Sequence, residues 1–191
     1  RSLRPSDEIS VRSSRSSDVE KMSHNIELIR DGDLRIALTG VCCSGKSTLA
    51  QALLGPRVVI PNGDSESLAL ADIIIHVHDI RSCGFSSDER VLLQDVVKFL
   101  NPQESGRLLF ALTRSDTVGD ECRNKGAQEF ERQVSEMYGF KPEIYVVAAP
   151  LWNLSWQEET SGRNLAARCF RGASGMECLL RRIEHIRWIG G

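Results

Sequence analysis

The stretch that most constrains the fold is GVCCSGKS at residues 40–47, which matches the pattern G-x-x-x-x-G-K-[ST] in full. The apolar run LRIALTG precedes it and predicts a short strand, and TLAQALLG follows it with leucines and alanines at helical spacing. A strand, a glycine-rich loop and a helix thus occur in the order that a phosphate-binding loop requires. The sequence therefore predicts a strand, loop and helix unit with a phosphate site at its centre.

Apolar strand-like segments alternate with amphipathic helical ones along the rest of the chain. Ser86 and Glu89 are spaced as a capping-box pair ahead of one of these helices. Alternation of this kind predicts an α/β fold, a three-layer P-loop NTPase (Rossmann-like) domain with a mostly parallel sheet and ligands at the carboxyl ends of its strands. The predicted strands are 34–39, 56–61, 71–79, 107–113 and 143–149, and the predicted helices are 48–54, 90–100, 126–138 and 174–188.

The N-terminal part of the chain differs from the rest in composition. Residues 1–17 are rich in Ser and Arg and predict a flexible tail. Residues 18–32 are predicted to form an N-terminal helix, because apolar side chains recur at helical spacing from Val19 to Ile29. Residues 33–191 then form the folded domain that contains the glycine-rich loop.

Length and composition limit the classes of function. The 191 residues suit one well-buried domain with a tail, and a net charge of −2 implies no DNA or RNA partner. No apolar run approaches the roughly 20 residues that span a bilayer, and no signal peptide is evident, so a cytoplasmic protein is expected. The six cysteines are scattered, which indicates neither a disulfide framework nor a zinc site.

Each position of the loop has an expected role. Gly40 and Gly45 let successive backbone N–H groups turn towards phosphates, and the following helix adds the positive end of its dipole. Lys46 supplies charge for the β- and γ-phosphates, and the hydroxyl of Ser47 is the expected ligand of Mg²⁺, the one predicted cofactor. The predicted phosphate-binding residues are Gly40, Cys43, Ser44, Gly45, Lys46, Ser47 and Thr48.

Two adjacent cysteines, Cys42 and Cys43, occupy the middle of the loop. A nucleotide site tolerates small side chains there, and we favour the interpretation that the two cysteines are small side chains with no chemical role. A redox switch is the alternative, because a helix N-terminus lowers the pKa of a nearby thiol.

A second motif, TRSD at residues 113–116, follows the predicted strand RLLFALT. It corresponds to the N/T-K-x-D motif of GTP-binding proteins, with Arg114 in place of the usual Lys. The carboxylate of Asp116 can accept two hydrogen bonds from the ring N–H and amino group of guanine, an arrangement that adenine does not offer. The alternative is a surface turn after a strand, where Asp and Ser are common.

With these motifs, the chain resembles the P-loop GTPases of the translation-factor-related class, most like the Era, septin and dynamin-type G domains, from about Leu34 to Ile189. The resemblance rests on GVCCSGKS, ADIIIHVHD, TRSD and VVAAP at 146–150, and RGASGMECLL resembles the lead into the last helix of such domains. Residues 151–173 are then an insertion within the loop that leads to the last helix. The resemblance implies binding of GTP or GDP, with a homodimer or a protein effector as partner. The base-contacting residues that it implies are Thr113, Arg114, Asp116, Ala148 and Ala149.

The chain departs from this family in the segment that would carry catalysis. Only 23 residues, 48–70, separate Ser47 from Ala71, and the nearest approach to D-x-x-G is IPNG at residues 60–63. No catalytic residue is assigned, so we expect slow or partner-assisted GTP hydrolysis by a molecular switch or assembly GTPase. A pseudo-GTPase scaffold is one alternative.

The second alternative is an ATP-dependent P-loop kinase of small molecules, in which Asp79 would organise a metal. We favour the interpretation that Asp79 is an ordinary residue at the end of a strand and binds no metal. His76 and His78 alternate with apolar residues on the same predicted strand and therefore share a face. Structural imidazoles are favoured there over a metal-binding pair.

Overall fold

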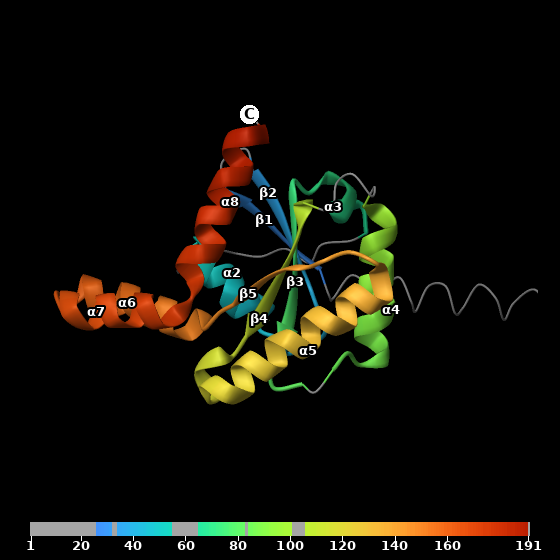
Figure 1. Ribbon diagram of the computed structural model, residues 1–191. Coiled ribbons are helices and arrows are strands. Elements are labelled where there is room, and N and C mark those ends of the chain that lie inside the picture. The colour runs from blue at the N-terminus through green and yellow to red at the C-terminus, as the bar shows by residue number, and fades with distance from the viewer. Residues whose placement is uncertain (1–25, 32–33, 55–64, 83, 101–105, 191) are drawn as a thin grey trace, which may run out of the picture.

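A computed structural model describes residues 26–31, 34–54, 65–82, 84–100 and 106–190. Within these ranges, five strands form one sheet whose spatial order follows the chain (Figure 1). They are β1 (Ile26–Asp31), β2 (Leu34–Thr39), β3 (Ile73–Asp79), β4 (Leu108–Thr113) and β5 (Glu143–Val146). Strands β2 to β5 are parallel and β1 pairs antiparallel with β2. The expected α/β class with a mostly parallel sheet is confirmed.

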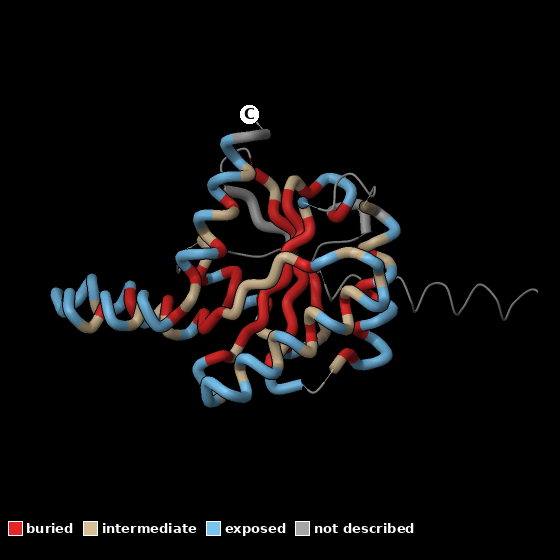
Figure 2. Tube along the Cα trace, in the orientation of Figure 1, coloured by how far each residue is buried: buried red, intermediate tan, exposed pale blue. Residues whose placement is uncertain are grey.

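Helices cover both faces of this sheet (Figure 1). Leu38, Ile75 and Leu109 pack on one face with α2 (Lys46–Leu54), α6 (Ala149–Thr160) and α8 (Met176–Gly190). Ala37 and Phe110 belong to the opposite cluster with α3 (Ser65–Leu70), α4 (Ser87–Phe99) and α5 (Asp120–Tyr138). The central strands are therefore buried on both faces (Figure 2), as their continuous apolar sequences require.

The predicted helix over residues 18–32 is wrong in its described part. Residues 26–31 form β1, in which Ile26 pairs with Thr39 and Asp31 pairs with Leu34. In sequence, only two residues separate Asp31 at the end of β1 from Leu34 at the start of β2, and the predicted helix is replaced by this antiparallel pair of strands. Pairing with β2 overrides the helical spacing of the apolar residues.

The start of α4 differs from the predicted capping box in one respect. The hydroxyl of Ser86 accepts a hydrogen bond from the backbone N–H of Glu89 at 3.1 Å, as expected of an N-cap. The carboxylate of Glu89 instead turns into the protein, where the residue is 2% exposed and contacts His76 and His78. Buried imidazoles thus take the acceptor that a capping box would use at the helix end.

The predicted insertion at residues 151–173 is helical. It lies within α6 and α7 (Asn164–Ser174), a helical pair that projects from the side of the molecule (Figure 1). The guanidinium of Arg171 stacks over the rings of Trp152 and Trp156, 5.8 and 5.3 Å from their centroids, and also pairs with Glu159. These contacts hold α7 against α6.

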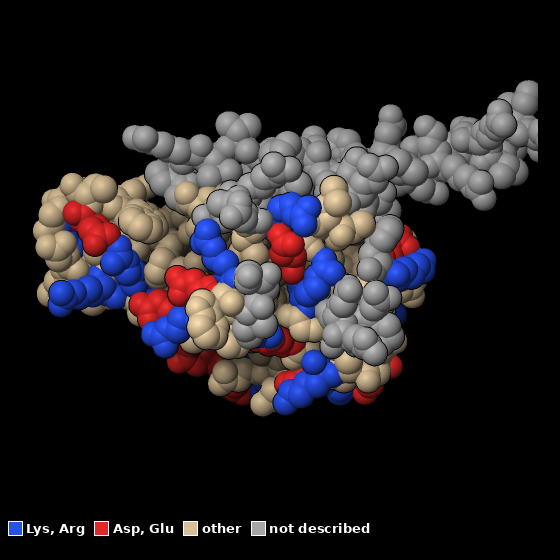
Figure 3. Space-filling model, turned by 90° about the horizontal axis from the view of Figure 1, so that it is seen from above, with Lys and Arg blue, Asp and Glu red and all other residues tan. Residues whose placement is uncertain are grey.

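The predicted tail at 1–17, residues 18–25 of the predicted helix and the predicted strand at 56–61 lie outside the described residues. No helix in the described ranges is long and apolar enough to cross a membrane. On the face shown in Figure 3, acidic and basic side chains are interspersed over the described surface. This distribution agrees with the small net charge of −2.

Candidate functional site

The candidate site is at the edge of the sheet where the parallel strands β2 to β5 have their carboxyl ends. GVCCSGKS joins β2 to α2, and TRSD follows β4. Parallel pairing of β2 with β3 and of β3 with β4 brings the two motifs to the same edge. Sheet topology therefore explains why segments about 70 residues apart in sequence can contact one another.

The glycine-rich loop requires a residue without a side chain at Gly40. Its φ is +145°, and a Cβ atom there would lie 2.3 Å from the carbonyl oxygen of Val77. The loop therefore packs directly on β3. The ammonium of Lys46 lies inside the loop and donates hydrogen bonds to the carbonyl oxygens of Gly40 at 2.8 Å and Val41 at 2.9 Å.

Ser44 gives the loop a buried polar atom that lacks a protein partner. The residue is 1% exposed, and among the described residues its hydroxyl has no hydrogen-bond partner. That oxygen lies beside Gly40, 2.8 Å from the point where a Cβ atom of the glycine would be. Leaving a buried hydroxyl unsatisfied costs about 1–3 kcal/mol. A ligand within the loop would remove this cost.

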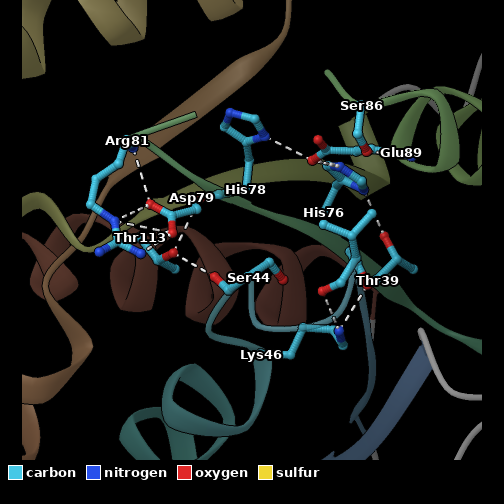
Figure 4. A network of polar contacts seen from close by, with 12 residues as sticks. Thr39, Ser44, Lys46, His76, His78, Asp79, Arg81, Ser86, Glu89 and Thr113 are labelled. Atoms are coloured by element: carbon cyan, nitrogen blue, oxygen red, sulfur yellow. Dashed lines mark hydrogen bonds and ion pairs between the residues drawn. The ribbon is translucent and has the colours of Figure 1, made fainter. Parts of the chain in front are cut away.

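Direct hydrogen bonds join the two motifs (Figure 4). The hydroxyl of Thr113 donates to the carbonyl oxygen of Ser44 at 2.6 Å and also lies 3.1 Å from the carbonyl oxygen of His78. The guanidinium of Arg114 donates to the carbonyl oxygen of Cys43 at 3.0 Å. Arg114 adopts the left-handed conformation with φ 61°, which is uncommon outside glycine. The turn after β4 is thus fastened to the glycine-rich loop.

Charged side chains flank this junction. Asp79 at the end of β3 accepts from the backbone and guanidinium of Arg81, and its carboxylate lies 3.2 Å from Nε of Arg114. Partial burial would raise the pKa of Asp79, but the two guanidinium groups hold that pKa below its usual range. Asp79 therefore remains a carboxylate whose acceptor positions are used by arginines.

Asp116 lies in the short 3₁₀ helix η2 (Ser115–Thr117) and is exposed. The backbone N–H of Ser115 donates to the carbonyl oxygen of Val147, which connects this turn to the chain after β5. Ala148 is buried, and its N–H donates to the carbonyl oxygen of Ser174 at 2.7 Å. The N–H of Ala148 is therefore already used within the protein, whereas the carboxylate of Asp116 faces solvent.

A buried polar network lies beside the loop (Figure 4). The ring of His76 contacts the hydroxyl of Thr39 at 3.0 Å through Nδ1 and the carboxylate of Glu89 at 3.1 Å through Nε2. Nδ1 of His78 lies 2.7 Å from the same carboxylate oxygen. Because an ionised carboxylate only accepts, His76 carries its proton on Nε2 and accepts from Thr39 at Nδ1.

The environment fixes the charge of this network. Burial lowers the pKa of His76, so its imidazole is neutral near pH 7. Burial would raise the pKa of Glu89, but hydrogen bonds from His76 and His78 lower it to about 2. The prediction that these two histidines share a face is confirmed, and their common carboxylate partner is the residue that the capping-box interpretation misassigned.

The remaining predicted residues lie where the loop meets α2. Gly45 approaches Thr113, since a Cβ atom would be 3.2 Å from its hydroxyl oxygen. Ser47 is exposed in the first turn of α2, and the carbonyl oxygen of Thr48 accepts from the amide of Asn153 on α6 at 3.4 Å. Sequence reasoning missed Arg81 and Asn153, because no motif marks them and only the fold brings them to this edge.

A magnesium site would have to be completed by a bound ligand. The exposed hydroxyl of Ser47 is an oxygen donor of the kind that Mg²⁺ prefers. Within the described ranges, however, no group of three or more His, Cys, Asp or Glu side chains could hold a metal ion. A magnesium ion at Ser47 would need its remaining ligands from a bound molecule and from water.

In comparisons with known proteins, neither a protein-family model nor a curated sequence matches this chain.

Proposed function

We propose that the chain is a P-loop guanine-nucleotide-binding domain that holds Mg·GTP or GDP across the two joined motifs. The observation that carries this proposal is the junction itself, in which Thr113 and Arg114 donate to the carbonyl oxygens of Ser44 and Cys43. A nucleotide has phosphates at one end and a base at the other, so its site needs a phosphate loop and a base-selective turn in fixed relation. The junction supplies that relation.

The phosphate end of the proposed site uses the chain's own donors. The hydroxyl of Ser44, which has no hydrogen-bond partner within the described part of the chain, and the ammonium of Lys46 lie within the loop, and α2 begins at Lys46. A phosphate would gain the positive end of the helix dipole and exchange the carbonyl contacts of Lys46 for a charged partner. Mg²⁺, held by Ser47 and the phosphates, would neutralise part of the negative charge.

At the base end, Asp116 would select guanine through its exposed carboxylate. Ala148 supports this end by packing rather than by a base contact, because its N–H already donates to Ser174. We propose slow or partner-assisted hydrolysis, since catalysis in such sites depends on segments that position water and metal. The chain between Gly55 and Asp64, where such segments would belong, lies outside the described residues.

The kinase alternative has less support from the geometry. It requires Asp79 to organise a metal, whereas that carboxylate is paired with Arg81 and Arg114. A pseudo-GTPase scaffold would use the same nucleotide site and differ only in the loss of hydrolysis.

Calorimetric titration with Mg·GTP, Mg·GDP and Mg·ATP tests the proposal. We expect the guanine nucleotides to bind and ATP to bind at least tenfold more weakly, and Lys46→Ala to abolish binding. Asp116→Asn should shift preference from guanosine to xanthosine nucleotides, because an amide can donate to the xanthine oxygen. Asp120→Asn, at an exposed carboxylate in the first turn of α5, is the matched control. GTP affinity unchanged by Asp116→Asn would refute guanine selection.

A further inference from the structure

The two cysteines in the middle of the loop form a close thiol pair. Cys42 and Cys43 are both exposed, and their Sγ atoms lie 3.5 Å apart. The other described cysteines are also exposed but lie singly on α5, α7 and α8. Cys43 adopts the left-handed conformation with φ 63°, which costs free energy in a residue with a side chain. The loop therefore holds two accessible thiols in contact through a strained backbone.

We propose that Cys42 and Cys43 are a peroxide-sensitive dithiol. Its oxidation to a disulfide reversibly prevents the phosphate loop from binding nucleotide. This inference rests on the proposed function, because it assigns regulation to the same loop.

The reaction balances with a peroxide as the oxidant. The thiolate of Cys42 attacks one oxygen of hydrogen peroxide, which yields a sulfenic acid and hydroxide, and the hydroxide takes up the proton that the thiol lost. The sulfur of Cys43 then attacks the sulfenic sulfur, forms the S–S bond and expels the second oxygen as water. Two thiols lose two electrons and two protons in total, and one peroxide becomes two waters. The hydrogen bond between the thiols raises the pKa of Cys43, and either sulfur can attack the peroxide first without changing this balance.

Disulfide formation must alter the backbone that would cradle phosphate. Neighbouring Cα atoms are about 3.8 Å apart across a trans peptide, whereas disulfides usually join Cα atoms about 4.4–6.8 Å apart. Because the Cα separation across a planar trans peptide is fixed, the disulfide could close only if the backbone dihedral angles of both cysteines changed and the peptide between them lost planarity. Two contacts fix this region now, one from Arg114 to the carbonyl oxygen of Cys43 and one from the N–H of Ser44 to the carbonyl oxygen of Val41. Their loss would turn the loop's N–H groups away from a phosphate.

The test uses the full chain, reduced, desalted and then treated with hydrogen peroxide. We expect the peptide that contains Cys42 and Cys43 to lose about 2 Da, the mass of two hydrogens, by mass spectrometry. Affinity for Mg·GTP should fall at least tenfold and return after treatment with dithiothreitol. Cys42→Ser should bind Mg·GTP before and after peroxide, and Cys178→Ser, which removes an exposed cysteine from α8, should behave as the unsubstituted chain.

The outcomes separate this inference from the proposed function. Absence of the 2 Da loss at the pair, oxygen addition in its place, or disulfide formation without loss of GTP affinity each overturns the switch. If the reduced chain does not bind Mg·GTP, the proposed function fails and regulation of nucleotide binding fails with it. The mass measurement, which needs no nucleotide, then still shows whether the dithiol oxidises.

Discussion

At the scale of single residues, Glu89 shows how one buried charge can organise its surroundings. Its carboxylate accepts from the rings of His76 and His78, which follow each other at alternate positions of β3. Burying a carboxylate is costly unless charge-assisted hydrogen bonds offset the lost hydration. Removal of the carboxylate would leave two imidazole N–H groups without an acceptor, so its role differs from that of an ordinary residue in a helix first turn.

Glu89→Ala should therefore destabilise the protein by about 2–6 kcal/mol, since each of the two orphaned buried donors costs about 1–3 kcal/mol. Glu89→Gln should lose less, because its amide oxygen still accepts. Asp88→Ala, at an exposed neighbour in the same turn, should cost at most about 1 kcal/mol. Urea denaturation measures all three variants. Similar losses for Glu89→Ala and Asp88→Ala would contradict a role for the buried carboxylate.

At the scale of elements, the sequence predicted the parts that local patterns determine. The apolar runs of β3 and β4 and the spacing of GVCCSGKS specify strands and a loop without help from the rest of the chain. The interval 26–31 could not be assigned in this way, because its apolar residues fit a helix and only pairing with β2 makes a strand. The contacts of Thr113 and Arg114 with the loop also depend on strand order, so sequence alone could not provide them.

Gly175 joins α7 to α8 and follows Ser174, whose carbonyl oxygen accepts a hydrogen bond from the N–H of Ala148. Its φ is +67°, and a Cβ atom there would lie 2.3 Å from the carbonyl oxygen of Val146 at the end of β5. Gly162, between α6 and α7, has φ +76° but no atom within 4 Å of such a Cβ. The two glycines therefore differ in steric space at nearly the same backbone conformation.

Gly162→Ala should cost about 1 kcal/mol of unfolding free energy from the left-handed conformation alone. Gly175→Ala should cost more, because β5 and α8 must also separate, and this shift would disturb the bond from Ala148 to the carbonyl oxygen of Ser174. Urea denaturation and Mg·GTP calorimetry report the two effects. Equal losses of stability would show that the end of β5 adapts to a side chain at no cost.

At the scale of the whole molecule, His76 couples β2, the strand before the glycine-rich loop, to α4 and makes the free energy of unfolding depend on pH. The groups that face its ring are Thr39 on β2, Glu89 on α4 and His78 on β3, and the charge of Lys46 on α2 also acts on it. Burial lowers the pKa of His76 below its ordinary value of 6.5. In the unfolded chain the same imidazole is solvated and titrates near that value.

The free energy of unfolding should therefore fall as pH drops from 7.5 to 5.5. In this interval the unfolded chain takes up a proton at His76 that the folded protein excludes, so the unfolded state gains stability with a slope of at most about 1.4 kcal/mol per pH unit. A second loss follows below about pH 4.5, where the unfolded chain protonates Glu89 while the folded-state pKa is about 2.

Urea denaturation at pH 7.5, 6.5 and 5.5 measures the first loss, and ring ¹⁵N chemical shifts at pH 7.5 should show His76 neutral and protonated at Nε2. His185→Gln, at an exposed histidine on α8, is the matched control. A flat profile between pH 7.5 and 5.5, or a charged His76 at pH 7.5, would contradict the buried neutral imidazole. The coupling of β2, β3 and α4 would then rest on apolar packing alone.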